Sequence, residues 1–323
     1  MLRACQRDDQ AIPLGVMSQI QRAGVVGTGA MGRNHARIYS LLPNAELTAI
    51  YDADRSRAAA VANEFGGTPV DSLEEFFSLV DLASVAVPTV AHREIGCKLL
   101  EAGVHVLIEK PIAPDIADAQ ALVETARRCN KLLAVGHVER FNPVLRQLEE
   151  RLSSPRFIEA HRLSPFPNRS MDIGVILDLM IHDLEVILHL VKSPVVAIDA
   201  VGVSVLTSTE DIANARLRFA NGCVANVTAS RISPERMRKI RVFQGDCYLS
   251  LDYMLQEGSM YVKDLNGISK VEVEIEKGEP LLMELQSFVE AVSRGETPAV
   301  TGQQGMAALE LALKVTEIAR AGM

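Results

Sequence analysis

An apolar segment that breaks into a glycine-rich turn is the feature that most constrains this sequence. The run Gly24-Val25-Val26 leads directly into the turn Gly27-Thr28-Gly29-Ala30-Met31-Gly32. In a strand-turn-helix unit the first glycine permits the tight turn, the second lets the backbone approach a pyrophosphate, and the third lets the helix pack on the strand. Asp52 ends a second apolar run, where a carboxylate can accept hydrogen bonds from both ribose hydroxyls. The spacing predicts a nucleotide-binding fold with these residues at the cofactor: Gly27, Gly29, Ala30, Met31, Gly32 and Asp52.

The acid at position 52 also bears on which cofactor is bound. Its negative charge would repel the 2′-phosphate of NADP, so the sequence favours NAD. Arg55 and Arg57 follow closely. We interpret them as solvated residues at the start of a helix; the alternative is that they hold the 2′-phosphate, which would favour NADP.

Strand-like and helix-like segments alternate up to Asn142. The predicted strands are Ala23–Val26, Leu47–Tyr51, Leu82–Val87, Val104–Ile108 and Leu132–Gly136. The predicted helices are Gly32–Leu42, Ser56–Phe65, Ala91–Ala102 and Ile116–Asn130. Because the strands are apolar throughout, they suit a parallel sheet that is buried on both faces. This half is therefore predicted to be an α/β Rossmann domain with a doubly wound parallel sheet.

The pattern changes after Asn142-Pro143. A long apolar helix is expected over Gly174–Val191 and a final helix over Gly302–Ala321. Between them lie predicted strands at Val195–Leu206, Ile212–Phe219, Cys223–Arg231, Lys239–Gln244, Cys247–Tyr253 and Val271–Glu276. Strands grouped in this way indicate an α+β domain on a largely antiparallel, open sheet. We expect a poorly structured leader (1–20), an NAD-binding domain (21–142) and a domain for substrate binding and oligomerisation (143–323).

The overall composition excludes several classes of function. A net charge of −8 and the absence of tryptophan argue against a nucleic-acid surface. No apolar run is long enough to span a bilayer, so no membrane association is expected. The five cysteines are scattered without a CxxC pair, which indicates a reduced, cytoplasmic protein without a zinc site.

A lysine is predicted at the carboxyl edge of the parallel sheet. Glu109-Lys110-Pro111 directly follows the fourth predicted strand. Ligands of such sheets bind beyond the carboxyl ends of the strands, so Lys110 can point towards a nicotinamide ring. The alternative is an ordinary solvated lysine.

Four polar residues recur at helical spacing on the apolar helix of the second domain. They are Asp178, His182, Glu185 and His189. This stripe has three interpretations: a solvated face, an internal Asp178–His182 pair, or a general base with an orienting carboxylate. Metal binding is a weaker interpretation, because no third ligand is near in sequence.

Two further segments carry polar groups that can line a cleft. Gly136–Pro143 follows a predicted strand and contains His137, Glu139 and Arg140. Glu139 and Arg140 either face the cleft or pair with each other as a hinge salt bridge. The loop before the polar helix contains Asn168 and Arg169, and that arginine either binds a phosphate or is a plain surface residue.

Together these segments resemble the Gfo/Idh/MocA family of sugar and polyol dehydrogenases, from about Ala23 to the C-terminus. The matching pieces are Gly27–Gly32, Asp52, Val87-Pro88-Thr89 with His92, Glu109-Lys110-Pro111 and Asp178-x-x-x-His182. The resemblance implies NAD as the cofactor, with contacts from Pro88, Thr89, His92, Glu109 and Lys110. It also implies that Lys110, Asp178 and His182 form the catalytic group. Our mechanistic hypothesis for this group is that Asp178 orients the His182 imidazole.

Within the family the closer resemblance is to the UDP-N-acetylglucosamine 3-dehydrogenases. It lies in Gly136–Pro143 and Ile173–Asp183. It implies oxidation of the C3 hydroxyl of the nucleotide sugar, ahead of an aminotransferase on a route to lipid A. The candidate substrate contacts are His137, Arg140, Asn168 and Arg169. The alternatives are a dehydrogenase of a free polyol or monosaccharide such as an inositol, and a non-catalytic NAD-binding sensor.

A homo-oligomer, either a dimer or a tetramer, is also expected. Small and apolar residues lie on both faces of the predicted strands in Val195–Arg231. One of these faces needs cover beyond the chain's own helices, and a second subunit can supply it.

Overall fold

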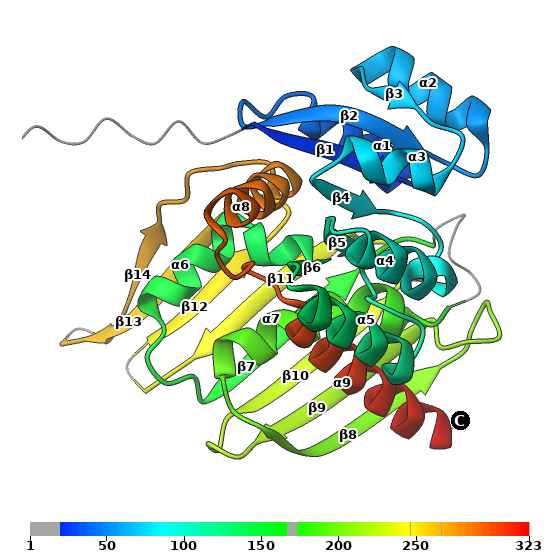
Figure 1. Ribbon diagram of the computed structural model, residues 1–323. Coiled ribbons are helices and arrows are strands. Elements are labelled where there is room, and N and C mark those ends of the chain that lie inside the picture. Colours follow the sequence, from blue (N-terminus) through cyan, green and yellow to red (C-terminus); the bar gives the residue numbers. More distant parts are fainter. Residues whose placement is uncertain (1–19, 167–172, 246, 266, 323) are drawn as a thin grey trace, which may run out of the picture.

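The chain folds around two sheets that are joined by helices (Figure 1). The computed structural model describes residues 20–166, 173–245, 247–265 and 267–322. Asn168 and Arg169, which were predicted to contact substrate, lie outside the described residues, as does nearly all of the predicted leader.

The N-terminal sheet has six parallel strands in the order β3-β2-β1-β4-β5-β6. The strands are β1 (Gln21–Val26), β2 (Ala45–Tyr51), β3 (Thr68–Pro69), β4 (Leu82–Val85), β5 (His105–Glu109) and β6 (Leu133–Gly136). The helices are α1 (Ala30–Tyr39), α2 (Arg55–Phe65), α3 (Leu73–Leu79), η1 (Thr89–Ala91), α4 (His92–Glu101) and α5 (Ile116–Cys129). The predicted doubly wound Rossmann sheet is confirmed. The sequence did not indicate β3 and α3, because both are short.

Short polar residues determine where these helices begin. The side chains of Asp54, Ser72 and Asp115 each accept a hydrogen bond from a backbone N–H in the first turn of α2, α3 and α5. Each cap satisfies one of the backbone donors that a helix start leaves unpaired. A helix in the connection to the second sheet begins with the same kind of side-chain cap. Asn142 caps α6 (Pro143–Arg151), which follows the short helix η2 (Val138–Phe141).

The second sheet has eight strands in the order β14-β13-β12-β11-β7-β10-β9-β8. They are β7 (Phe157–Leu163), β8 (Val195–Val203), β9 (Ile212–Phe219), β10 (Val224–Ser230), β11 (Met237–Phe243), β12 (Cys247–Asp252), β13 (Glu257–Asp264) and β14 (Gly267–Val273). Among the described strands of this sheet, only β7 and β10 pair in parallel, so the predicted, largely antiparallel sheet is confirmed.

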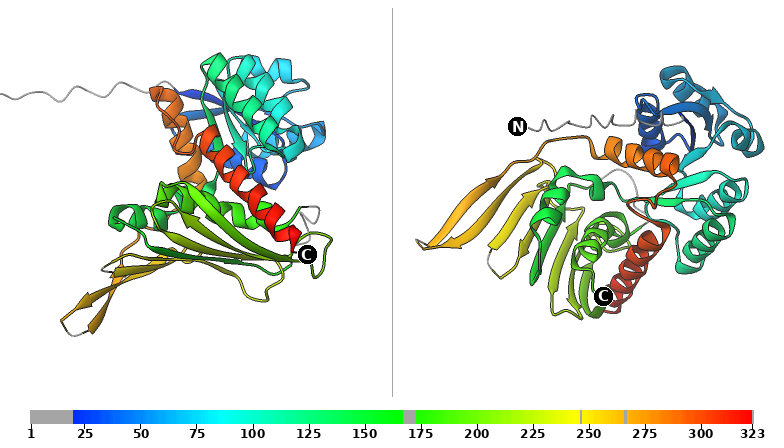
Figure 2. Two further views of the ribbon diagram at one scale, coloured as in Figure 1. Left: turned by 90° about the horizontal axis from the view of Figure 1, so that it is seen from below. Right: turned by 60° about the vertical axis from the view of Figure 1, so that its left-hand side comes forward.

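Two strands of this sheet were not predicted, and one prediction was misplaced. β7 and β13 contain charged and small residues, which obscure the alternation of apolar and polar residues that is typical of a strand. The alternating segment Val271–Glu276 was predicted as a strand with one wet face, but β14 ends at Val273 and is exposed along nearly all its length. The reason is its position, because β14 is the edge strand of a hairpin that projects beyond the helices (Figure 2).

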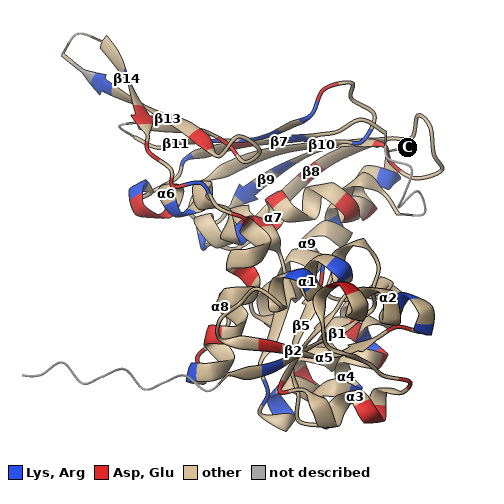
Figure 3. Cartoon of the chain, turned by 90° about the horizontal axis from the view of Figure 1, so that it is seen from above, with Lys and Arg blue, Asp and Glu red and all other residues tan. Residues whose placement is uncertain are grey.

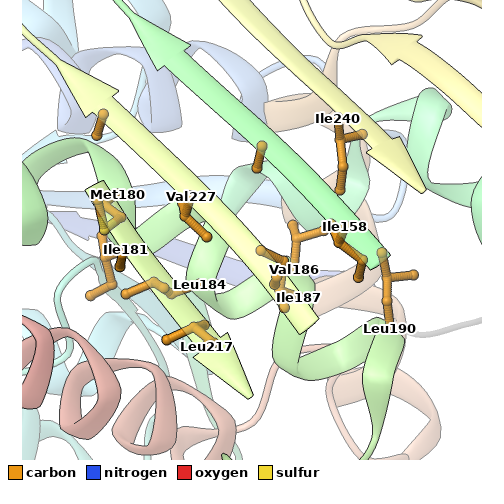
Figure 4. Packing of buried hydrophobic residues seen from close by; sticks show 14 of the residues in the cluster. Ile158, Met180, Ile181, Leu184, Val186, Ile187, Leu190, Leu217, Val227 and Ile240 are labelled. Carbon is orange, nitrogen blue, oxygen red and sulfur yellow. The ribbon is translucent and has the colours of Figure 1, made fainter. Parts of the chain in front are cut away.

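The predicted helix Gly174–Val191 has two parts. A π-helical turn, η3 (Ile176–Met180), leads into α7 (Ile181–Val191). Apolar residues of α7, among them Leu184 and Ile187, pack on inward-facing residues of the sheet such as Ile158 and Ile240 (Figure 4). This core fixes the position of the polar residues that start the helix.

The last two helices return to the N-terminal sheet. α8 (Pro280–Arg294), which the sequence did not indicate, buries Leu285, Phe288 and Val289 against the core around β1 and α1. The predicted helix Gly302–Ala321 is confirmed as α9. Val300, just before it, accepts a hydrogen bond from the Val135 N–H at 3.1 Å. The C-terminal part of the chain therefore packs on the first domain through α8 and through the segment before α9.

Acidic and basic residues are interspersed along the chain in both parts of the molecule (Figure 3). In the described ranges, no helix has the length and apolar character needed to cross a bilayer.

Candidate active site

The glycine-rich turn has the geometry that its spacing predicts. Gly27 has a positive φ of 90°, and a side chain there would meet the Ala86 carbonyl oxygen at 2.6 Å. A side chain on Gly32 would lie 1.8 Å from the carbonyl oxygen of Gly27. Both positions therefore require glycine, the first for the turn and the second for close packing of α1 on the turn.

The same turn leaves room and free donors for a pyrophosphate. A Cβ on Gly29 would meet nothing within 4 Å. Gly29 is the N-cap of α1, and it supplies no side-chain cap for the first N–H groups of the helix. These donors and the positive end of the helix dipole fit the phosphates of a dinucleotide. Ala30 and Met31, the first two residues of α1, are exposed at this point.

Asp52 is held as a carboxylate beside this turn. Its Oδ2 accepts hydrogen bonds from the Thr28 N–H and hydroxyl, both at 2.7 Å, and its Oδ1 accepts one from the Asp54 N–H at 2.8 Å. Partial burial alone would raise the pKa of Asp52, but these hydrogen bonds outweigh it and lower the pKa. The remaining lone pairs fit ribose hydroxyls, and the charge disfavours a 2′-phosphate. Arg55 and Arg57 are exposed at the start of α2, as interpreted from the sequence.

His92 is buried, and both of its ring nitrogens contact backbone carbonyl oxygens. The ring is buried, with Nδ1 3.0 Å from the Pro111 carbonyl oxygen and Nε2 3.0 Å from the Val87 carbonyl oxygen. Burial lowers the pKa of His92, which favours the neutral ring. The predicted cofactor contact of His92 is therefore wrong, because both ring nitrogens are used to hold two loops together. Pro88 and Thr89, on one of these loops, remain predicted cofactor contacts.

Glu109, at the end of β5, contacts both α1 and the backbone of Lys110. Its Oε1 lies 2.9 Å from Nε2 of the buried His35 on α1, and its Oε2 accepts a hydrogen bond from the Lys110 N–H at 3.3 Å. These contacts fix the end of β5, from which Lys110 extends. Contact of Glu109 with the cofactor remains a prediction.

Lys110 crosses from the first domain to the second. Its Nζ donates to the Asp178 carbonyl oxygen at 2.7 Å and to Asp178 Oδ1 at 3.2 Å, and both side chains are about one-fifth exposed (19% and 20%). The alternative of a solvated lysine is therefore wrong. Two predicted catalytic residues meet across the interface between the domains.

Asp178 pairs with Lys110 and not with His182. Among the described residues, no hydrogen bond joins the Asp178 carboxylate to the His182 ring. The prediction that Asp178 orients this imidazole is therefore wrong. The π-helical turn explains the difference, because its wider winding removes Asp178 from the α-helical i, i+4 alignment.

His182 lies against a second histidine, His137. Its ring stands edge-on to that of His137, with the centroids 6.3 Å apart and the planes at 85°. His182 Nδ1 and both His137 ring nitrogens are buried, and no described residue hydrogen-bonds to them. Burial, followed by the positive charge of Lys110, holds the pKa of His182 well below its ordinary value. The same two causes lower the pKa of His137 to about 3, so both rings are neutral at pH 7.

The rest of the polar stripe is structural. Glu185 is buried and accepts a hydrogen bond from Arg140 at 2.7 Å, while His189 pairs with Glu149 on α6. Burial raises the pKa of Glu185 to about 7, although Arg140 opposes the shift. The interpretation of the stripe as a solvated face is therefore wrong, because it faces other parts of the protein. The predicted substrate contact of Arg140 is also unsupported, since its guanidinium is engaged by Glu185.

A buried arginine that the sequence did not single out supports the catalytic end of α7. Arg162 on β7 donates to both carboxylate oxygens of Asp183, at 2.8 and 3.0 Å, and to Glu139 Oε1 at 2.8 Å. The predicted Glu139–Arg140 hinge salt bridge is wrong, because these neighbours face different partners. Asp183 follows His182 directly, so the network of Arg162, Glu139 and Asp183 anchors the backbone that carries His182.

The described part of the chain contains no group of three or more His, Cys, Asp or Glu side chains arranged to hold a metal ion. The site instead combines the uncapped start of α1 at Gly29, the Lys110–Asp178 pair and the neutral His182. Such a group can bind a hydroxyl and accept its proton beside a dinucleotide.

Two family models match the chain. The oxidoreductase family with an NAD-binding Rossmann fold (GFO_IDH_MocA) matches residues 21–137, and the GFO/IDH/MocA C-terminal domain matches residues 148–246. UDP-N-acetylglucosamine 3-dehydrogenase of Acidithiobacillus ferrooxidans is 36% identical over 301 residues, which is 91% of this chain and 96% of that protein. Its solved structure superposes with a TM-score of 0.90, covering 93% of this chain and 98% of that one.

A second relative is more distant. The scyllo-inositol 2-dehydrogenase (NAD(+)) of Bacillus subtilis is 25% identical over 338 aligned positions, covering 94% of this chain and 95% of that protein. Both relatives therefore span the two domains, and the similarity is higher to the enzyme that acts on a nucleotide sugar.

Proposed function

Because the chain belongs to the Gfo/Idh/MocA family of NAD-binding oxidoreductases, we propose that it oxidises the C3 hydroxyl of UDP-N-acetylglucosamine to the 3-keto sugar. The observation that carries the substrate is the 36% identity to the Acidithiobacillus ferrooxidans enzyme over 91% of this chain. The chemistry is supported by the hydrogen bonds of Lys110 to Asp178 and by the electrostatic effect of Lys110 on His182.

Each residue has a distinct task in this proposal. NAD, when bound at the glycine-rich turn, supplies the hydride acceptor. His182 accepts the hydroxyl proton, which its neutral ring permits at pH 7. Lys110 donates a hydrogen bond to the same oxygen as negative charge develops there. Asp178 fixes the position of the Lys110 ammonium through two contacts.

The lowered pKa of His182 predicts the acid side of the pH profile. A base must be unprotonated, and a lower pKa keeps the ring unprotonated at lower pH. Initial-rate kcat/KM is therefore expected to stay level as the pH falls to the ordinary histidine value of 6.5, and to decline only below it. A midpoint at or above 6.5 in the profile would contradict this role for His182.

The position of the oxidised carbon can be tested by isotope labelling. We expect deuterium placed at C3 of UDP-N-acetylglucosamine to appear in the NADH formed, while deuterium at C4 stays in the sugar. Recovery of the C4 label in NADH would show that the regiochemistry is different.

The proposal also places the reaction in the cytoplasm, ahead of an aminotransferase on a route to a diamino-sugar lipid A. The new ketone is the group that such an enzyme converts into an amine. Addition of an aminotransferase with glutamate is therefore expected to increase the yield of NADH.

We also propose that the chain forms a homo-oligomer through the outer face of the eight-stranded sheet. Helices cover only the face towards the first domain in the described part of the chain (Figure 2). Four aromatic residues form a continuous stack on the other face, with ring centroids 5.7, 5.0 and 4.4 Å apart: Phe157, Phe243, Tyr248 and Tyr261. Exposed Val201 and Val203 extend this face towards β8. Such surfaces are typical of subunit contacts.

Replacement of Tyr248 by glutamate tests this interface. The charge would lie inside the aromatic stack, so the variant is expected to sediment at the 35.1 kDa of one chain, whereas wild type sediments at a multiple of it. Leu41→Glu, at an exposed site in the first domain, is the control. A wild-type protein that sediments as a single chain would contradict the proposal.

A further inference from the structure

Arg238 lies on the same face of the second sheet as the catalytic residues. It is opposite Arg162 in the register of β11 with β7. Side chains alternate along a strand, so Arg238 shares the inward face with the buried Ile240 and Val242. A cation on the inward face of a sheet is unusual, because this face otherwise forms the core.

The guanidinium of Arg238 has N–H donors that make no hydrogen bond to the described residues. Its Nη1 lies 3.6 Å from Glu139 Oε1, which is too long for a hydrogen bond, and its side chain is 50% exposed. Glu139 is already engaged by Arg162 at 2.8 Å and by the Asn142 amide at 3.3 Å. Within the described ranges, Arg238 donates no side-chain hydrogen bond, whereas Arg162 is fully engaged.

Arg238 is also linked to the backbone of His182 through Arg162 and Asp183. Arg162 holds Asp183, the neighbour of His182, and Arg238 stands beside Arg162. The positive charge of Arg238 is one of the groups that lower the pKa of His182, after burial, Lys110, Arg162 and His137. A half-exposed cation that makes no side-chain hydrogen bond to the described residues therefore lies on the inward face, beside the arginine that anchors the neighbour of His182.

We propose that Arg238 binds the diphosphate of the nucleotide-sugar substrate. This inference rests on the proposed function and names the residue that selects a nucleotide sugar over a free sugar. A guanidinium presents a planar pair of donors that matches two phosphate oxygens. The substrate's sugar ring then extends from the phosphate towards Lys110 and His182.

Arg128 provides a control in the first domain. Its side chain is 61% exposed and pairs with Glu101 at 2.7 Å. It lies near the end of α5, which leads into the start of β6, so it is at the sheet edge opposite the glycine-rich turn and outside the outer face proposed for the subunit contact. Arg238→Gln and Arg128→Gln therefore remove the same charge, but only the first removes it from the inward face of the second sheet.

The test measures UDP binding by calorimetry on the NAD-saturated enzyme, together with the kinetics of UDP-N-acetylglucosamine oxidation. In Arg238→Gln the Kd of UDP and the KM of the sugar nucleotide should rise about 10- to 100-fold, as expected for lost charge-assisted hydrogen bonds. The kcat, the KM of NAD and the melting temperature should not change. Arg238→Lys should recover part of the loss, and Arg128→Gln should behave as wild type.

Two outcomes separate this inference from the proposed function. UDP binding that is equal in wild type and Arg238→Gln, or absent from both, overturns the inference. If wild type binds UDP through Arg238 but does not oxidise UDP-N-acetylglucosamine, the inference stands and the proposed function fails.

Discussion

Replacement of Lys110 by methionine is expected to lower kcat by about 10³-fold while NAD binding is retained. Methionine keeps the length of the side chain but removes the ammonium, which donates to the Asp178 carbonyl oxygen at 2.7 Å and to its carboxylate at 3.2 Å. In the proposed reaction this ammonium stabilises the developing charge on the substrate oxygen, so its loss affects the chemical step.

Lys98→Met controls for the loss of a lysine. Lys98 forms an exposed i, i+4 pair with Glu94 on α4 and should have wild-type kcat when replaced. NAD binding by both variants can be measured by calorimetry. A Lys110→Met enzyme with near-normal turnover would exclude Lys110 from catalysis.

Replacement of Arg162 by methionine is expected to lower the free energy of unfolding by about 3–5 kcal/mol. The guanidinium is 3% exposed and holds two carboxylates, those of Glu139 and Asp183, which are also buried. The variant leaves both negative charges in the protein interior without their main partner. That cost is larger than the net value of an intact buried ion pair.

The measurement is urea unfolding at pH 7, with Arg146→Met as the control. Arg146 is 79% exposed and pairs with Glu150 on the surface of α6, so its loss should hardly move the midpoint. An Arg162→Met midpoint equal to that of wild type would show that the network of Arg162, Glu139 and Asp183 does not anchor α7.

The cofactor half of the site could be predicted because its signals are local. The glycine-rich turn, Asp52 and Lys110 each sit directly at the end of a strand, and parallel strands bring their carboxyl ends to one edge. Spacing along the chain is then enough to place them together. His92 was misassigned because nothing in the sequence shows that both its ring nitrogens meet backbone carbonyls.

The second half depends on contacts between distant segments. Arg140 and Glu185 are far apart in sequence, so their pairing could not be read from spacing, and neighbouring Glu139 and Arg140 suggested a salt bridge that does not form. The π-helical turn also could not be predicted, because it changes the winding of the helix without an obvious change in amino-acid composition. It brings Asp178 to Lys110 instead of to His182.

The positions of Arg162 and Arg238 along their strands could have singled them out from the sequence. Each shares its side of a strand with buried apolar residues, Ile158 and Ala160 in one case, Ile240 and Val242 in the other. A charged residue on the inward face of a strand needs a partner or a ligand. Once the strands are known, the alternation of side chains along them therefore identifies both arginines as inward-facing charged residues.

The proposed oxidation is tested most directly by the formation of NADH from purified protein and NAD, with UDP-N-acetylglucosamine or free myo-inositol as the only substrate. The account predicts NADH with the nucleotide sugar and none with the free polyol, with a larger yield when an aminotransferase and glutamate remove the 3-keto product. Formation of NADH with myo-inositol but not with the nucleotide sugar would be consistent with the family and would contradict the assigned substrate.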